Sequence, residues 1–381
     1  MDDVNPYSFL REWFSVPHLS HVSRMDLKMW LAWAVFDRQF EEIVSPAAMS
    51  ELEAMIADGE RELGITVPLT VSGEVVRPPA MRLNVDRVKA DHRPLVYYIA
   101  TGIMGFAGDA FLYFLGFRRE RIGPVFFWVR LASASRHSTG EFAIDEDTPL
   151  VFVHGVGMGL ATYIPLLLKL SGPVRRPVNR TIILIELPHV SMKFNVDVVP
   201  RMDAIAECTA IIMNRYNIHT PALWMAHSLG TFVFAAVQRL QPHLVAGVIL
   251  VDPVCFLLWE PDLLRNFCYL NPETPMQIIQ QYHISRELTI SSYFHRHFWW
   301  HECVQFAKNM PKHSLVFISE NDVIYNTERV KRYLEKNGIP LKVMKGMSHG
   351  GWLMDRQATA MLADAAHLCN VPKVAGSSKE K

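Results

Sequence analysis

Residues 222–236 read ALWMAHSLGTFVFAA, an apolar run with His227 and Ser228 side by side near its middle. The first half has the near-continuous apolar character of a strand buried on both faces. The small residues after Ser228 suit a tight turn into a helix, so the run predicts a strand, a turn at the serine and a helix. An alternative is that Ser228 only caps the helix that follows, since serine is a favoured N-cap residue. Partners elsewhere in the chain must decide between the two.

The chain has 381 residues, of which half are hydrophobic, and this is enough apolar material for a sizeable core. Lys plus Arg and Asp plus Glu are both 38, so the formal net charge is zero. Basic residues form no run longer than two. This composition argues against a nucleic-acid-binding protein.

The five cysteines are odd in number, widely spaced and without a C-x-x-C pair (Cys208, Cys255, Cys268, Cys303 and Cys369). They predict reduced cysteines scattered through the core of an intracellular protein. The first residues, MDDVNPYSFL, are acidic and lack the basic and apolar order of a secretory signal. We therefore expect an intracellular location.

Residues 1–121 differ from the rest and predict a helical N-terminal extension, with helices near 25–44 and 47–64. The apolar stretch 95–117 is just long enough to span a bilayer. Asp109 and three internal glycines weigh against a span, because a charge at bilayer depth is costly. A buried or interfacial helix is favoured over a transmembrane span, and membrane contact through 95–117 stays open. A short polar tail occupies 371–381.

From residue 122 onwards, short strand-like runs alternate with helical patterns such as 200–216 and 229–240. This alternation predicts an α/β fold with a mostly parallel central sheet and helices on both faces. Ligands of such sheets bind at the carboxyl ends of the strands, so polar residues there are the first functional candidates. The predicted strands are 123–132, 149–155, 180–188, 221–228, 245–253, 313–322 and 339–350.

The strand that ends at His154 runs into a glycine-rich turn, HGVGMG. Glycines at 155, 157 and 159 let the backbone bend and bring its amide N–H groups close to a ligand. A phosphate cradle is disfavoured, because the P-loop lysine is absent and the glycine spacing does not match a dinucleotide fingerprint. Backbone N–H groups that hold an oxyanion fit the turn better.

Three further strands end in Ser228, Asp322 and His349, in that chain order. Asp252 also ends a strand and is the rival for the acidic position; Glu320 is expected to point elsewhere. The histidines of the HRHFWWH segment, residues 295–301, suggest a metal cluster, but no matched acidic or cysteine ligands accompany them. A position on the surface of a helix is favoured for them.

With four landmarks in order (HGVGMG, AHSLG, SENDVI and SHGGW), residues 122–370 resemble an α/β-hydrolase-fold protein. The sequence departs from the elbow pattern G-x-S-x-G at Ala226, where one methyl group replaces the first glycine's hydrogen. The stretch of about 255–311, rich in aromatic residues, resembles the cap insertion of this family. The resemblance implies that this cap is helical and covers the site.

The resemblance also implies the roles of individual residues. Ser228 would be the nucleophile, His349 the general base and Asp322 the acid that orients it. The backbone N–H groups of Val156 and Leu229 would form the oxyanion hole. The turn that carries Val156 would be supported by His154, Gly155 and Gly157.

The function expected from the resemblance is a serine hydrolase that cleaves a small, lipophilic carboxylic ester through an acyl-enzyme. This chemistry needs no metal and no organic cofactor. Two other classes stay open: an acyltransferase that uses the same three residues, and a non-catalytic binding protein of the same fold.

Overall fold

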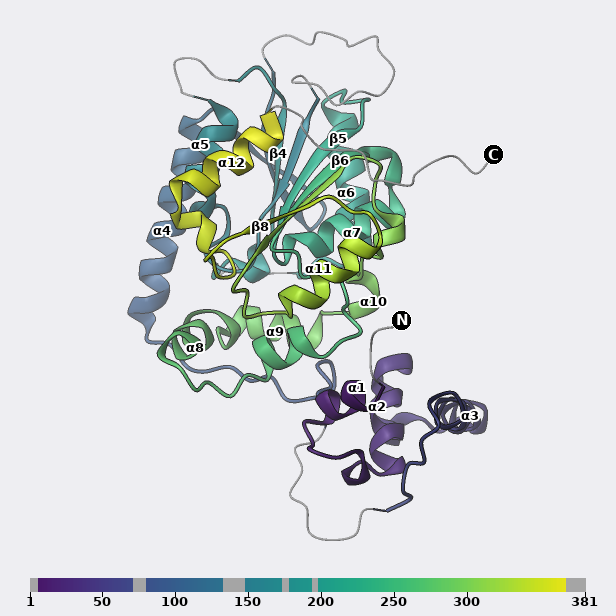
Figure 1. Cartoon of the computed structure of the whole chain (residues 1–381). Helices are drawn as coiled ribbons and strands as arrows, with labels where there is room; N and C mark the ends of the chain where they lie inside the picture. Colours follow the sequence, from purple (N-terminus) through teal and green to yellow (C-terminus); the bar gives the residue numbers. More distant parts are fainter. Residues whose placement is uncertain (1–5, 71–79, 133–147, 173–177, 194–197, 368–381) are drawn as a thin grey trace, which may run out of the picture.

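The computed structural model of the chain describes residues 6–70, 80–132, 148–172, 178–193 and 198–367. An eight-stranded sheet stands at the centre, with helices on both of its faces (Figure 1). Three short helices from the beginning of the chain form a separate group beside the cap helices.

The sheet is mostly parallel. Its order is β1-β2-β4-β3-β5-β6-β7-β8; the hairpin strands β1 and β2 are antiparallel to each other, β2 is antiparallel to β4, and all other pairs are parallel. The strands are β1 (Arg118–Ile122), β2 (Val125–Arg130), β3 (Leu150–Val153), β4 (Ile182–Glu186), β5 (Ala222–His227), β6 (Val245–Val251), β7 (Ser314–Ser319) and β8 (Leu341–Met344).

The central strands are buried at every position of β3, β4, β5 and β7. Alternate side chains enter two different cores, since Val151 and Val153 of β3 lie in one and Leu150 and Phe152 in the other. Helices cover both faces, and this explains why these strands are apolar throughout instead of alternating. The α/β fold expected from the sequence is confirmed.

The hairpin of β1 and β2 corrects the sequence-based boundary. Residue 121, the expected end of the extension, lies inside β1, which is already paired with β2. The charged sequence RRERI does not look like a strand, but β1 is an edge strand whose arginines are mostly exposed. One of them, Arg119, reaches across the hairpin to the buried Glu186.

The helices on the sheet are α5 (Ile164–Ser171), α6 (Met202–Arg215), α7 (Gly230–Leu240), α11 (Thr327–Lys336) and α12 (Arg356–His367). Helix α12 packs on α5, and α6 packs on α7. Four of the cysteines, Cys208, Cys255, Cys268 and Cys303, are buried and free; Cys369 and the tail 371–381 lie outside the described residues.

The cap lies between β6 and β7 and is helical, as the resemblance implies. Its elements are η6 (Leu264–Cys268), α8 (Pro275–Gln280), η7 (Gln281–Ser285), α9 (Leu288–Arg296), α10 (Trp300–Cys303) and η8 (Ala307–Asn309). Aromatic rings bind the cap to the sheet domain, since Phe298 of the cap contacts both Phe294 of α9 and Phe232 of α7.

The N-terminal helices are α1 (Pro6–Phe14), α2 (Arg24–Phe36) and α3 (Pro46–Leu63). Helix α3 ends at Gly64, which has a positive φ of 62°, whereas α2 ends earlier than expected because Asp37 adopts a left-handed conformation. This group contacts the rest of the protein through Trp13, whose Nε1–H donates to the Trp259 carbonyl at 3.2 Å.

Helix α4 (Leu95–Phe114) is the apolar segment that the sequence singled out. It forms a helix of 20 residues, but it lies on the surface and only a small part of it is buried. Of the two positions favoured from the sequence, the buried one is therefore wrong; the interfacial one is taken up below. Within the described residues, α4 is the one helix long and apolar enough to cross a membrane by length and composition.

Candidate active site

The candidate site lies where the chain reverses direction along the sheet. After β3 the chain moves outward to β4, and it then returns to the other side of β3 to form β5. The connections that follow β3 and β5 therefore diverge at their carboxyl ends and leave room for a ligand. The HGVGMG turn follows β3, and Ser228 follows β5.

Ser228 occupies a strained turn. Its φ is +52°, a conformation that residues other than glycine rarely adopt. Its N–H donates to the Val251 carbonyl at 3.1 Å, and its carbonyl accepts from the hydroxyl of Thr231 at 2.6 Å. Helix α7 begins at Gly230 with no side-chain cap. Ser228 therefore does not cap this helix, and its hydroxyl is free for another partner.

Close packing around the turn explains its small residues. A Cβ at Gly230 would lie 2.5 Å from the Val153 carbonyl oxygen, and a Cβ at Gly155 would lie 2.8 Å from the Ser228 Cβ. Neither position has room for a side chain. Ala226 is two residues before the serine, fully buried inside β5, where its methyl group is accommodated.

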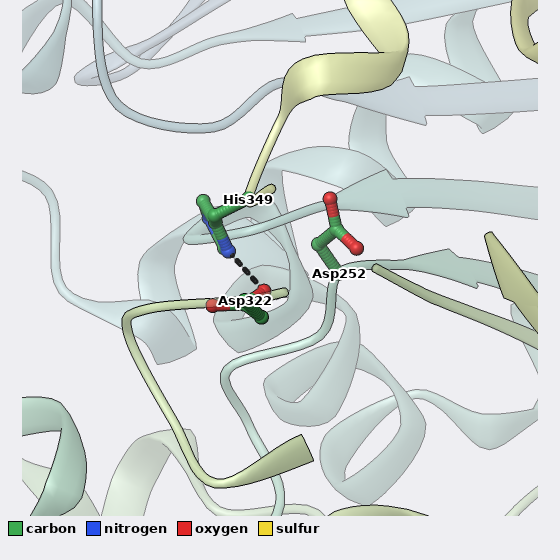
Figure 2. Close-up of side chains that lie close together, drawn as sticks. All are labelled: Asp252, Asp322 and His349. Atoms are coloured by element: carbon green, nitrogen blue, oxygen red, sulfur yellow. Dashed lines mark hydrogen bonds and ion pairs between the residues drawn. The ribbon is translucent and has the colours of Figure 1, made fainter. Parts of the chain in front are cut away.

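The serine, histidine and aspartate lie in one hydrogen-bonded chain. The Oγ of Ser228 is 2.8 Å from Nε2 of His349, and Nδ1 of His349 is 2.6 Å from Oδ2 of Asp322. Figure 2 shows the ring of His349 directed at Asp322. Because Nδ1–H donates to the carboxylate, Nε2 is left to accept the serine proton.

The rival acid, Asp252, lies beside this chain but makes other bonds. One carboxylate oxygen accepts from the Ser319 N–H and the other from the Gly350 N–H, both at 2.8 Å. Asp252 thereby ties the backbone next to His349 to β7, and no bond joins it to His349 in Figure 2. Glu320 points away, because it accepts from Lys345 and from the Gly346 N–H.

Two negative charges determine the protonation of His349. Burial lowers its pKa, but the charge and hydrogen bond of Asp322, together with the charge of Asp252, outweigh burial and raise the pKa to about 9. The side chain of Asp322 is fully buried, so little solvent screens its charge. The surroundings therefore stabilise the imidazolium form of His349.

Two amide groups fit the predicted oxyanion hole. The N–H of Gly155 donates to the Tyr163 hydroxyl and that of Gly157 to the Val190 carbonyl, whereas the Val156 N–H between them has no acceptor among the described residues. Leu229 directly precedes α7, and its N–H also has no acceptor in the described part of the chain. Unpaired N–H groups at a turn and a helix start favour binding of an anion.

His154 holds the HGVGMG turn in place through two hydrogen bonds. Its Nδ1–H donates to the Gly155 carbonyl at 2.7 Å, and its Nε2 accepts from the Leu187 N–H at 2.9 Å. Burial lowers its pKa to about 4, so it stays neutral and can keep both bonds at neutral pH. His154 therefore joins the end of β3 to the segment after β4.

Sequence reasoning missed Tyr163 and the partners of His227. The Tyr163 hydroxyl accepts from Gly155 and donates to His227 Nδ1 at 2.6 Å. The other nitrogen, Nε2, faces Asp252 at 3.8 Å. His227 therefore lies between the Gly155 turn and Asp252, although its Nε2 makes no hydrogen bond among the described residues. Nothing at Tyr163 in the sequence signals this, because the tyrosine lies between strands.

One acidic group could be considered for a metal. Among the His, Cys, Asp and Glu side chains of the described residues, Asp252, Asp322 and His349 form the only group of three whose ligand atoms lie within 4.8 Å of one another. The 2.6 Å separation of His349 and Asp322 is that of a direct hydrogen bond, and both Asp252 oxygens already accept N–H groups. These contacts fit a hydrogen bond between His349 and Asp322 better than coordination of a metal ion by the three side chains. His295, from the segment weighed as a metal cluster, is buried and donates to the Ser291 carbonyl.

Known proteins were compared with the chain at the levels of sequence and structure. No protein-family model and no curated protein matches it. Esterase E25 matches with a TM-score of 0.47 and 12% identity over 74% of this chain and 88% of its own. Carboxylesterase CesB from Bacillus subtilis matches with a TM-score of 0.45 and 12% identity over 71% of this chain and 99% of its own. A bacterial membrane phospholipase A has the same TM-score and identity over 71% of this chain and 96% of its own.

The chain has the α/β-hydrolase fold. Its own strand order, the serine at the turn after β5, the acid after β7 and the histidine after β8 are the defining features of that fold. The inserted cap between β6 and β7 and the helical extension before β1 are additions to the same framework.

Proposed function

We propose that the chain is a serine hydrolase that cleaves a lipophilic carboxylic ester. The observation that carries this proposal is the hydrogen-bonded chain from Ser228 through His349 to Asp322 at the carboxyl edge of the sheet. These three groups have the order and contacts that nucleophilic acyl transfer requires.

His349 takes the proton of Ser228 as the serine oxygen attacks the ester carbonyl. The Val156 and Leu229 N–H groups hold the resulting oxyanion, a contribution of about 3 kcal/mol for each donor. The imidazolium then gives its proton to the leaving alcohol, and an acyl-enzyme remains. Water, activated by His349, releases the acid and restores the serine. Asp322 keeps the ring oriented and stabilises its charge in both steps.

The lipophilic character of the substrate is supported by the cap. Phe298 of the cap lies against Phe232 of α7, the helix that begins after Ser228, and Phe294 and Phe267 extend this aromatic cluster within the cap. Ser228 itself is 9% exposed, so the ester must reach a serine that is almost covered by protein. An intracellular location, with membrane contact through 95–117, belongs to the same proposal.

The test is turnover of p-nitrophenyl esters of increasing acyl length by the full chain and by Ser228→Ala. We expect the wild type to prefer medium or long chains and the variant to lose turnover at every length. Equal turnover by the variant would contradict the proposal. Parallel reactions with an added alcohol test for acyl transfer: an ester product that outweighs the acid would identify an acyltransferase.

A further inference from the structure

The outer surface of α4 carries no charge. Its exposed large side chains are all apolar or aromatic; besides Leu95 and Met104 they are Val96, Ile99, Ile103, Phe106 (76% exposed), Tyr113 and Phe114. We call these six the apolar face of α4. The other exposed positions of the helix are Leu, Met, Ala or Gly, so the Tyr113 hydroxyl is its one exposed side-chain hydrogen-bonding group.

The opposite side of α4 is fixed to the protein. A Cβ at Gly108 would lie 2.7 Å from the Ala161 Cβ, so the helix backbone meets the sheet domain closely. Asp109, the only charged residue of the helix, pairs with Lys193 at 3.3 Å, and Lys193 also pairs with the buried Glu186. A helix that spans a bilayer faces lipid or other apolar helices on all sides. This attachment therefore favours a helix that lies in the plane of a membrane surface.

The apolar face continues onto the cap. Tyr97 of α4 contacts the ring of Tyr282 in η7, with centroids 6.3 Å apart, and its hydroxyl donates to the His283 carbonyl. Helix α8, directly before η7, exposes Met276, Ile278 and Ile279. Figure 1 shows α8 next to one end of α4 on the same side of the molecule.

We propose that the protein docks on an anionic membrane surface through the apolar face of α4 together with α8. Lipid suits this surface better than a second protein copy, because protein interfaces need about one hydrogen bond per 100–200 Å² and this helix face offers one hydroxyl. Charge also suits lipid: exposed Arg121 follows the helix, lies over Phe126 on the face of the hairpin where Tyr113 of α4 meets Trp128, and can contact anionic headgroups.

This docking deepens the proposed function, because it places the cap of the site against the phase that holds lipophilic esters. The apolar face would lie at the boundary of headgroups and acyl chains. Substrate would then pass from the bilayer to Ser228 beneath the cap without crossing water. The docking itself depends on α4 and not on the chemistry at Ser228.

The experiment is flotation of the purified full chain with phosphatidylcholine and phosphatidylserine vesicles. We expect Ile103→Asp and Phe106→Asp each to lower vesicle binding by about tenfold or more, since each replaces lipid-buried apolar area with a charge. The matched control is Val44→Asp, at an apolar residue that is 87% exposed outside this face, and it should bind as the wild type does. Equal thermal midpoints would show that all three variants are folded.

Three results would overturn the docking proposal. The first is unchanged flotation of Phe106→Asp. The second is resistance of the bound wild type to extraction with alkaline carbonate, which indicates a spanning helix. The third is a dimer in vesicle-free solution that Phe106→Asp dissociates. Ser228→Ala separates docking from catalysis. We expect this variant to float as the wild type does, and loss of its flotation would contradict the independence of docking. Flotation of a wild type that cleaves no ester would refute the hydrolase and leave the docking intact.

Discussion

At the carboxyl edge of the sheet, the carboxylates of Asp252 and Asp322 are buried and hydrogen-bonded, whereas along α4 apolar side chains such as Ile103 and Phe106 are exposed. Asp252 and Asp322 each accept backbone N–H groups inside the fold. Helix α4 instead contacts the domain through a stripe around Gly108 and presents the rest to its surroundings. Burial of polar groups and exposure of apolar ones both cost free energy, so both regions point to function.

The largest expected effect concerns the acid of the site. Asp322→Asn should lower kcat/KM by about three to four orders of magnitude, because the amide no longer stabilises the imidazolium of His349. Asp252→Asn should lower it by only about tenfold, since Asp252 acts through the backbone of Gly350. Steady-state kinetics on one ester measure both. A larger loss from Asp252→Asn would assign the acid role to that residue.

The same glycine-to-alanine substitution at two positions compares the close packing at the Ser228 turn with an uncrowded position in a helix. Gly230→Ala should destabilise the protein by about 2 kcal/mol or more, because its Cβ would collide with the Val153 carbonyl. Gly59→Ala in α3 should stabilise it by about 0.5–1 kcal/mol, because nothing lies within 4 Å and alanine favours the helix. Urea unfolding gives both values. Unchanged or higher stability of Gly230→Ala would show that the turn at Gly230 is not tightly packed.

The pH profile tests the charges at the site. His349 acts as a base when deprotonated, and its pKa of about 9 lies above the ordinary value. The rate at low substrate should therefore rise with pH towards 9 and fall as the pH drops below that value. Asp252→Asn removes one of the charges that raise the pKa of His349, so the midpoint should move to lower pH. An unchanged midpoint would mean that Asp252 does not act on the charge of His349.

The smallest effect is expected where the N-terminal helices meet the cap. Arg329 pairs with Glu12 of α1 and with Glu260 after β6, both at 3.0 Å. Glu12→Gln should cost only about 0.5–1 kcal/mol, since the pair is partly exposed to solvent. Thermal unfolding measures this. A loss of several kcal/mol would show that the extension depends on this ion pair.

The sequence predicted the sheet well because each buried strand is apolar on both sides. Ser228 and Asp322 were singled out because each follows such a strand, and His349 because it follows the last predicted strand; parallel strands bring their carboxyl ends to one edge. Strand β1 was missed, since an edge strand can carry the charges of RRERI in solvent. The sequence shows strand ends but not which strands are central.

Contacts between distant residues could not be predicted. Tyr163 joins the oxyanion turn to His227 only because the chain after β3 folds back beside β5. Asp252 was noticed as a strand end, but its bonds to Ser319 and Gly350 depend on the positions of two other strands. The exposure of α4 could not be predicted either, because a helix that is apolar on all sides shows no sequence pattern that distinguishes a buried position from an exposed one.

The most direct test of the central claim is labelling with a fluorophosphonate probe, followed by peptide mapping. The account predicts a single phosphonylated residue, Ser228, in the wild type and no labelling in Ser228→Ala. Asp322→Asn should label far more slowly, because its His349 is a poorer base. Labelling that persists in Ser228→Ala, or that maps to another residue, would contradict the account.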